Sequence, residues 1–531
     1  MGAATSRRST WIARIRRPTA GPALVLTALL AILPAVVRRV GDADFWWHYR
    51  TGRWITDHHA LPSHELYTYT VSDHRWWAQE YGYQVGVFVI DRLGGMLGVA
   101  LVLGALSWAA FWLMLARVRV RDHSLVVTAA ALVLAAGAGL AVWGPRAQVV
   151  DLFFVCLELW LIERFLERGG RALYAMPLLT VVWANLHGGV IFGPFLLGVV
   201  AAAVTIEALW RHRPEGMLRA RRLWLLMVAG LVAMSFSPDG PSLFTFIWST
   251  QFSVAAGEFV REWQPPNFTH IDMRGLELMV VLGLAGLAWR RLRTHDVALL
   301  LVATALALQS VRHISIYVAL VTPILVWEWS GMIQPLSSRV GRLFARSLRP
   351  LGAAAMVAVV LAGLGGTGFT AENLLRQAAA TRANYPVATS DWLASRPGLG
   401  THMFNEFGWG GYLANRFYGI PNRRVFVYGA TGLVGDPILV QYADVIHLAS
   451  NWEQILDFYG VDYVVFPPDQ PLTTALEATG HWARVHVDSV AVVYVRQRSL
   501  ASRLERERRT RHGAPVRARE GTHRSMTLDR H

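Results

Sequence analysis

A chain of 531 residues that is 53% hydrophobic, with 22 tryptophans and a positive mean hydropathy, has more apolar surface than ordinary soluble cores can bury. The net charge of +15 comes entirely from arginine, since the sequence contains no lysine, a bias typical of high-GC bacterial genomes. The arginines fall in short clusters between apolar stretches, as in membrane loops, which argues against a nucleic-acid-binding surface. The single cysteine, Cys156, excludes an internal disulfide and a thiolate metal site.

Apolar stretches able to cross about 30 Å of hydrocarbon as helices predict a polytopic α-helical membrane protein with about eleven spans. The stretches are residues 20–37, 95–116, 124–143, 147–166, 173–187, 189–209, 221–237, 274–290, 296–311, 314–329 and 351–369. The first follows a basic segment, 1–19, and has no small-residue cleavage site, so we expect an uncleaved helix. Residues 20–370 are thus predicted to form the transmembrane domain.

Arginine clusters set the predicted orientation. They occupy residues 7–17, 117–121, 164–171, 211–222, 290–293 and 339–349, and the helix count puts all of them on one side. The positive-inside rule makes that side, with the N-terminus, cytoplasmic. Two long loops, 38–94 and 238–273, are then external, and we expect the protein in the bacterial cytoplasmic membrane.

From about residue 385 the pattern changes to short β-branched or aromatic runs, such as 424–428 and 461–466. These alternate with helical stretches near 436–448 and 451–459. Residues 385–497 are therefore predicted to form an external α/β domain. Residues 498–531 are charged, lack aromatic side chains and are predicted to be a disordered basic tail.

Polar side chains gather at the predicted external ends of the spans, where the positive-inside bias does not explain them. They are Asp42, Asp44, His48, Arg146, Gln148, Asn185, His187, Glu258, Glu262, Arg312 and His313. Because distant segments place acids, imidazoles and guanidinium groups at one depth, we expect several of them to converge on one externally open cavity.

Asp44 and His48 share a helix face if this stretch is helical, since they lie four residues apart. A partly buried carboxylate here would serve as a general base on an acceptor hydroxyl. Asp42 and Asp44 also have the spacing of a metal-binding pair, a weak signal that leaves a divalent metal open. The alternative is an interfacial helix anchored by Trp46 and Trp47, with solvated carboxylates.

Arg146 and Arg312 are predicted to face outward, against the usual charge bias. A guanidinium can donate two hydrogen bonds to the oxygens of one phosphate, and it keeps its charge. Arg146 and Arg312 therefore predict a site for the phosphate of a lipid-linked substrate. His187 and His313 would then assist the departing phosphate. The alternatives are arginines that snorkel to membrane lipid and histidines with purely structural roles.

Five strings resemble a bacterial branch of the polyprenyl-phosphate-dependent glycosyltransferases of the GT-C superfamily. They are Gly41-Asp42-Ala43-Asp44-Phe45-Trp46-Trp47-His48, Trp183-Ala184-Asn185-Leu186-His187-Gly188-Gly189, Glu262-Trp263-Gln264-Pro265, Arg312-His313 and Phe407-Gly408-Trp409-Gly410-Gly411-Tyr412-Leu413. The resemblance covers most of residues 20–497. It implies a polyprenyl-phosphate-linked sugar donor, an extracytoplasmic acceptor in the cell envelope and inverting transfer, with Asp44, or else Asp42, deprotonating the acceptor.

The predicted catalytic residues are thus Asp44, Asp42 and His48. The predicted contacts to lipid phosphate or sugar are Arg146, Asn185, His187, Glu262, Arg312 and His313. Two other classes of function stay open. A transporter or flippase for a lipid-linked substrate would place polar groups near the midplane, where Asp151 and Glu158 are the main ones. A non-enzymatic scaffold or sensor would bind partners through residues 385–497.

The orientation is tested by cysteine labelling in intact cells. A cysteine introduced at Ser450 should react with a membrane-impermeant reagent, whereas one introduced at Arg213 should be shielded, because the arginine clusters place 211–222 in the cytoplasm. The reverse labelling pattern would show that the orientation is opposite to the predicted one.

Overall fold

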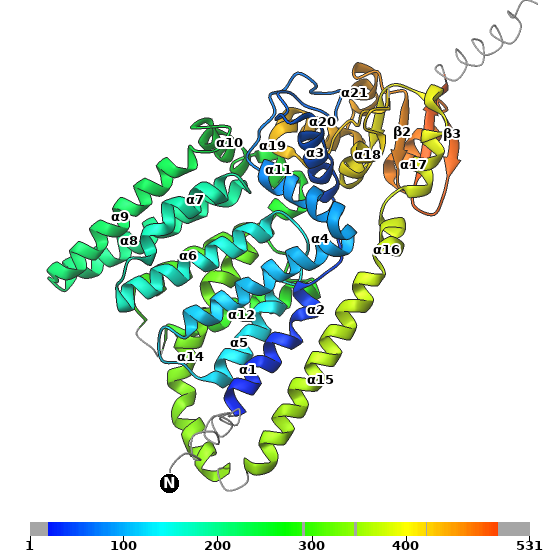
Figure 1. Ribbon diagram of the computed structural model, residues 1–531. Coiled ribbons are helices and arrows are strands. Elements are labelled where there is room, and N and C mark those ends of the chain that lie inside the picture. Colours follow the sequence, from blue (N-terminus) through cyan, green and yellow to red (C-terminus); the bar gives the residue numbers. More distant parts are fainter. Residues whose placement is uncertain (1–19, 289–291, 345–347, 421, 498–531) are drawn as a thin grey trace, which may run out of the picture.

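The computed structural model describes residues 20–288, 292–344, 348–420 and 422–497. The predicted basic segments 1–19 and 498–531 lie outside the described residues. The described chain forms a long helical bundle followed by a smaller region that contains a mixed sheet, and the smaller region sits over one end of the bundle (Figure 1).

The helices of the bundle coincide with the apolar stretches of the sequence. They are α1 (Ala20–Ala31), α2 (Leu33–Val36), α4 (Tyr81–Val118), α5 (Leu125–Ala138), α6 (Gln148–Arg168), α7 (Met176–Ala184), α8 (Phe192–Trp210), α9 (Pro214–Met234), α12 (Arg274–Gly286), α13 (Thr294–Gln309), α14 (Ile314–Phe344) and α15 (Leu348–Leu375). Four described segments are long and apolar enough to cross a membrane: Tyr81–Val118, Gly188–Trp210, Val311–Gly331 and Val357–Leu375. Four shorter apolar helices accompany them.

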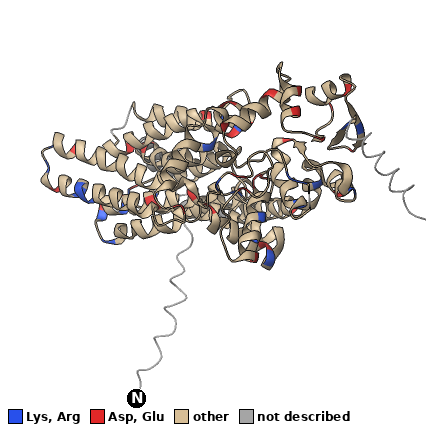
Figure 2. Ribbon diagram, turned by 90° about the horizontal axis from the view of Figure 1, so that it is seen from above, with Lys and Arg blue, Asp and Glu red and all other residues tan. Residues whose placement is uncertain are grey.

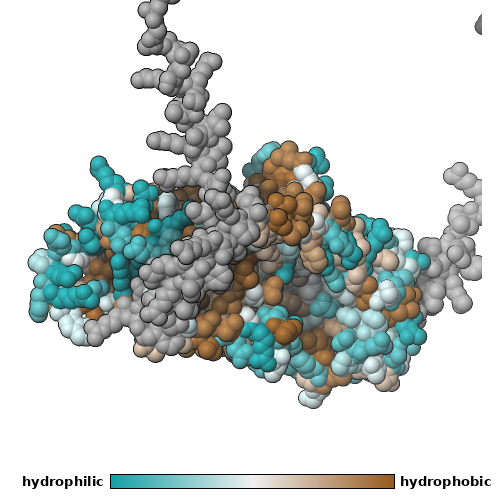
Figure 3. All heavy atoms as spheres, turned by 90° about the horizontal axis from the view of Figure 1, so that it is seen from below, coloured by the Kyte–Doolittle hydropathy of each residue, from teal (hydrophilic) through white to brown (hydrophobic). Residues whose placement is uncertain are grey.

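Large apolar side chains point outward from the bundle. Leu178, Leu225 and Leu364 are each at least 60% exposed, and only 11% of the apolar part of α15 is buried. Figure 3 shows apolar patches between hydrophilic ones on the face seen from below, and Figure 2 shows basic residues at the α8–α9 end. Exposed apolar surface of this extent requires an apolar surrounding, so the protein is a multi-pass membrane protein.

About half of the first long loop is helical. Helix α3 (Phe45–His58) begins directly after Asp44, and α4 starts well before the apolar stretch that was predicted to begin at residue 95. At Gly95 the helix is interrupted by a φ of 63°, a conformation that glycine adopts at little cost. The helix is therefore kinked at Gly95, where the predicted apolar stretch begins, and its first turns precede that stretch.

The second long loop consists of short helices: α10 (Ser242–Gln251), α11 (Val254–Phe259), η4 (Arg261–Trp263) and η5 (Ile271–Met273). Two further short helices join elements of the bundle, namely η3 (Gly188–Ile191) before α8 and η6 (Val311–His313) before α14. These segments bring the polar ends of α8 and α14 close to the loops.

The C-terminal region has a four-stranded mixed sheet in the order β1-β2-β4-β3. Its strands are β1 (Met403–Asn405), β2 (Tyr463–Phe466), β3 (Trp482–Val487) and β4 (Val492–Arg496), and its helices are α16 (Gln377–Asn384), α17 (Val387–Ala394), α18 (Gly410–Phe417), α19 (Thr431–Val434), α20 (Asp436–Ile446), α21 (Trp452–Phe458) and α22 (Pro471–Ala478). Strand β1 is parallel to β2, and the other pairs are antiparallel. The strand predicted within 461–466 and the helices predicted near 436–448 and 451–459 are confirmed.

The strand predicted at 424–428 is wrong. The segment forms only isolated bridges, and it crosses to the first loop, where the Val425 N–H donates to the Tyr67 carbonyl at 3.0 Å. Val425, Phe426 and Tyr428 are completely buried. An apolar run buried on all sides resembles a central strand in sequence, although here the burial comes from packing between two distant segments.

Side chains of the first loop hold it against the C-terminal region. The Thr70 hydroxyl donates to the Phe426 carbonyl at 2.8 Å, and the Tyr428 hydroxyl donates to the Glu65 carboxylate at 2.9 Å. Segments more than 350 residues apart thus form one unit at the end of the bundle.

Candidate functional site

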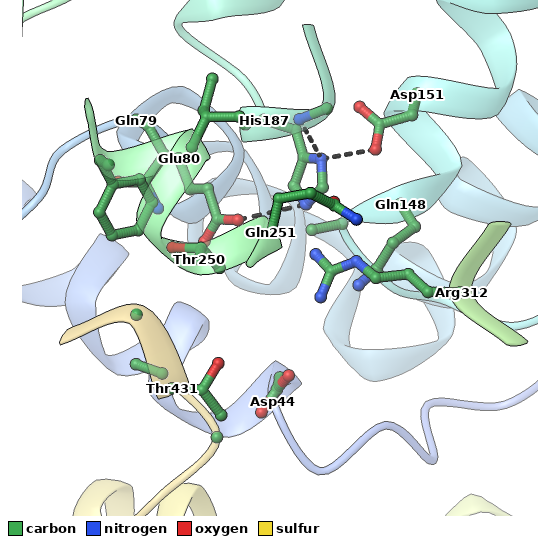
Figure 4. A pocket seen from close by; sticks show the side chains of 18 of the residues that line it. Asp44, Gln79, Glu80, Gln148, Asp151, His187, Thr250, Gln251, Arg312 and Thr431 are labelled. Carbon is green, nitrogen blue, oxygen red and sulfur yellow. Dashed lines mark hydrogen bonds and ion pairs between the residues drawn. The ribbon is translucent and has the colours of Figure 1, made fainter. Parts of the chain in front are cut away.

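A cavity of about 140 Å³ lies where the two long loops, the ends of α6, α8 and α14, and the C-terminal region meet. Six of the nine predicted site residues line it: Asp42, Asp44, His48, His187, Arg312 and His313. Figure 4 shows Asp44, Arg312 and His187 arranged around this space. The described structure thus brings together polar side chains from segments about 270 residues apart in the sequence.

Asp44 sits at the N-terminal end of α3, with its carboxylate beside the cavity. Its Oδ1 accepts a hydrogen bond from the Trp47 indole nitrogen at 3.2 Å, and its backbone N–H donates to Asp42 Oδ1 at 3.2 Å. The carboxylate also packs on Gly429, where a Cβ would lie 1.6 Å from Asp44 Oδ1. Only glycine at this position lets the C-terminal region approach so closely.

Burial raises the pKa of Asp44 to about 7, and the negative charges of Asp42 and Glu262 act in the same direction. The Trp47 hydrogen bond and the Arg146 guanidinium oppose the rise. A carboxylate with such a pKa can accept and release a proton near neutral pH. Trp47 is buried, as is Trp46, which packs on Tyr385 and Tyr412, so these tryptophans face protein rather than lipid.

Arg146 lies between two carboxylates. Its Nε is 3.3 Å from Asp42 Oδ2, and its Nη2 forms an ion pair with Glu262. Neither Arg146 nor Glu262 lines the cavity. The three residues tie the first loop, the start of α6 and the second loop together.

Arg312 differs from Arg146 because no carboxylate of the described residues lies within ion-pair distance of it. Its guanidinium stacks over the Trp263 ring, 4.8 Å from the centroid, and lines the cavity. A guanidinium that faces a cavity and has no carboxylate partner among the described residues is suited to bind an anion.

An alternating chain of acids and imidazoles forms another wall. His187 Nδ1 lies 2.7 Å from Asp151 Oδ2, His187 Nε2 lies 3.2 Å from Glu80 Oε1, and Glu80 Oε2 lies 3.5 Å from His48 Nδ1. Figure 4 marks the first two contacts with dashed lines. All four residues line the cavity.

The two imidazoles of this chain differ in charge. Burial alone would lower the pKa of His187, but Asp151 and Glu80 raise it to about 9, so the ring is cationic at neutral pH. Burial lowers the pKa of His48 to about 4 despite Glu80, so its ring is neutral. Burial would raise the pKa of Glu80, yet the contacts with His48 and His187 lower it to about 2.

Two predicted site residues have mainly structural surroundings. Asn185, at the C-terminal end of α7, donates to the carbonyls of Val181 and Phe236 at 2.7 and 3.1 Å and lies outside the cavity lining. His313 lines the cavity but is 3% exposed, with Nδ1 3.2 Å from the Leu306 carbonyl.

The acids of the cavity do not form a compact metal-ligand set in the described part of the chain. The group of three described acids and imidazoles close enough to share an ion is Glu163, His295 and Asp296, outside the cavity lining. There the Arg121 guanidinium already donates to Glu163 and Asp296.

Sequence reasoning gave no role at this site to Gln79, Glu80 and Gly429. Glu80 ends the Trp76-Trp77-Ala78-Gln79-Glu80 string immediately before α4, and an acid between tryptophans and an apolar stretch was a usable signal. Gly429 carries no such signal, because its role depends on contact with Asp44, 385 residues earlier.

Replacing His187 by Gln should remove pH-dependent stability. A histidine whose folded pKa is raised from 6.5 to about 9 stabilises the fold fully below pH 6.5, and this contribution is lost as the pH rises through about 9. The difference corresponds to roughly 3 kcal/mol. Melting temperatures in lipid should therefore separate wild type from His187→Gln at pH 6 and converge near pH 10. Exposed His481→Gln serves as the control, and a separation equal at both pH values would contradict the assigned charge.

No family model and no curated protein sequence matches this chain. Among solved structures, the oligosaccharyltransferase AglB of Archaeoglobus fulgidus, in complex with an inhibitory peptide and a dolichol-phosphate, matches 84% of this chain and 69% of its own at 11% identity and a TM-score of 0.49. ArnT of Cupriavidus metallidurans, bound to undecaprenyl phosphate, matches 89% and 97% at 15% identity and 0.43. The mycobacterial arabinofuranosyltransferase AftD matches 90% and 41% at 15% identity and 0.43. The chain is similar to these proteins in the general course of its fold, at low sequence identity.

Proposed function

We propose that this protein is a membrane glycosyltransferase that transfers a sugar from a polyprenyl-phosphate donor to a hydroxyl group of an extracytoplasmic acceptor. The observation that carries the proposal is the position of Arg312. It faces a polar cavity that contains the Asp44 carboxyl, it has no carboxylate partner among the described residues, and it also borders an apolar crevice.

The crevice beside Arg312 is narrow, with a volume of about 10 Å³. It shares Gln148, Arg312 and Ser315 with the cavity and is otherwise lined by Arg146 and by the apolar side chains of Val142, Trp143, Val149 and Leu152. A phosphate on Arg312 would place its sugar in the cavity, and its lipid tail would follow the apolar side chains only if the crevice widened. A free sugar phosphate would have no use for the apolar side.

In the proposed reaction, the Asp44 carboxylate takes the proton of the acceptor hydroxyl. The acceptor oxygen bonds to the anomeric carbon as the bond from that carbon to the phosphate oxygen breaks, which inverts the configuration. The electron pair leaves with the polyprenyl phosphate, and Arg312 stabilises the charge that develops there. The products are the glycosylated acceptor and the polyprenyl phosphate.

The ion pairs give Arg146 a different proposed role from that of Arg312. Since Asp42 and Glu262 already occupy its guanidinium, Arg146 serves to fix the loop that carries Asp44. His187 is likewise held by two carboxylates, so we propose that it positions the wall of the cavity and does not donate to the leaving phosphate.

The orientation and about eleven spans belong to the same proposal. The two long loops and the C-terminal region lie at one end of the bundle (Figure 1), the end that the positive-inside rule makes external. A donor whose phosphate lies at the outer membrane interface would reach the cavity from this side.

Replacing Asp44 by Asn keeps the shape of the side chain but removes the proton acceptor. Turnover should fall by about 10²- to 10⁴-fold while donor affinity changes little. In the wild type, kcat should rise with pH up to about 7 and then level off, because the base is active when ionised. Arg312→Ala should lower both donor affinity and turnover, and Arg312→Lys should restore part of the affinity. The measurement is transfer of labelled sugar from polyprenyl-phosphate donors by purified protein in lipid.

Asp57→Asn is a matched control, since Asp57 is an exposed acid on the same helix, paired with Arg53. Normal turnover in Asp44→Asn beside an active wild type would rule out this carboxylate as the base. Donor binding and lipid translocation without any transfer, unchanged in Asp44→Asn, would favour a transporter.

A further inference from the structure

The second long loop contains an uncharged stretch. Residues 240–257, between Asp239 and Glu258, include no charged side chain, and they form α10 and the first part of α11. Such a composition is unusual for a loop that lies in water, where charged and polar side chains dominate. The two faces of α10 account for it in different ways.

One face of α10 packs into the protein. Phe246 is buried, and it lines the cavity together with Ile247, Thr250 and Gln251. The C-terminal region packs on this face at Gly432, where a Cβ would lie 2.5 Å from Thr250 Oγ1 and 2.9 Å from the Phe246 ring. This face of α10 is therefore one wall of the cavity.

The opposite face presents large apolar side chains that the described protein leaves uncovered. Trp248 is 68% exposed and Phe252 is 59% exposed, and their rings lie 4.4 Å apart, one helical turn along. Val254, at the start of α11, is 75% exposed. Exposed apolar side chains that gather in this way mark a surface covered by lipid or by another protein.

The position of this apolar cluster, Trp248, Phe252 and Val254, favours lipid. Helix α9 exposes Leu225 and Val232 along the bundle, and Phe236, just past its end, is 67% exposed. Helix α10 follows directly, contacts η3 before α8, and lies at the same end of the bundle as the ends of α7 and α9 (Figure 1). The cluster thus continues the lipid-facing surface of α9. Tryptophan is enriched at the interface of membrane and water, whereas a protein partner would need a polar rim around its contact.

We propose that Trp248, Phe252 and Val254 insert into the lipid layer at the loop end of the bundle, while the opposite face of α10 forms the cavity wall. A helix with one face in lipid and the other on polar groups lies along the membrane interface. The bilayer thereby supports one wall of the cavity and holds this wall at the level of the lipid headgroups. The inference is independent of the proposed transfer reaction, because it uses no contact with a substrate.

The test measures the depth of single spin labels on the full chain in lipid nanodiscs. Cysteines replace Phe252 and Val254, and unsubstituted protein is the unlabelled control because its Cys156 is buried. Leu225→Cys on α9 is the reference for lipid. Phe458→Cys, at a position 79% exposed on α21 of the C-terminal region, is the reference for water. Collisions of each label with oxygen, which concentrates in hydrocarbon, are compared with collisions with a neutral, water-soluble nickel complex.

The labels at 252 and 254 should collide more with oxygen than with the nickel complex, as the label at 225 does. Their nickel collisions should be at least about tenfold rarer than those at 458, because a polar complex is excluded from hydrocarbon. Nickel collisions as frequent at 252 and 254 as at 458 would overturn the inference, since the cluster would then lie in water. Low collision rates with both reagents would also overturn it, because a second copy of the chain or a partner protein would then cover the cluster.

Discussion

The pairing of buried charges at the end of the bundle is the constraint on which the site depends. Three carboxylates, those of Asp42, Asp44 and Glu262, gather near the single guanidinium of Arg146, which binds Asp42 and Glu262. A buried charge without a partner is costly, so the pKa of the remaining acid, Asp44, is raised to about 7 and its carboxyl is only partly ionised at neutral pH. The same constraint leaves Arg312 as a cation facing the cavity without a carboxylate among its described neighbours. The pairing thus leaves one proton acceptor and one anion-binding group, each suited to a different part of a transfer reaction.

The C-terminal region is part of this site rather than a separate attachment. Its residues 429–433 line the cavity, and Gly429 packs directly on Asp44. Contacts between Glu65 and Tyr428, and between Thr70 and Phe426, fix that approach. Movement of the region relative to the first loop would change both the burial of Asp44 and the shape of the cavity. None of the described strands of its sheet lines the cavity. The sheet therefore affects the chemistry only by holding the residues that do line it in position.

Periodicity and charge in the sequence were sufficient to predict the apolar helices and the polar ends that gather at one depth. These features are local, since each depends on the composition of a single stretch. The partners of each polar group are not local. Arg146 and Arg312 look alike in sequence, yet only Arg146 meets carboxylates, and Gly429 acquires its role from a carboxyl in another region. The strand predicted at 424–428 is wrong for the same reason, because the burial of this segment comes from tertiary contact and not from a sheet.

The central claim is that Arg312 holds a lipid phosphate at the junction of a polar cavity and an apolar crevice. Its most direct test is a structure of the protein in lipid with a bound polyprenyl-phosphate sugar. The account predicts phosphate density within hydrogen-bonding distance of the Arg312 guanidinium, the lipid chain along Val142 and Leu152, and the sugar between Asp44 and Gln79. Density for the phosphate at another surface of the bundle, with the cavity filled only by water, would contradict it.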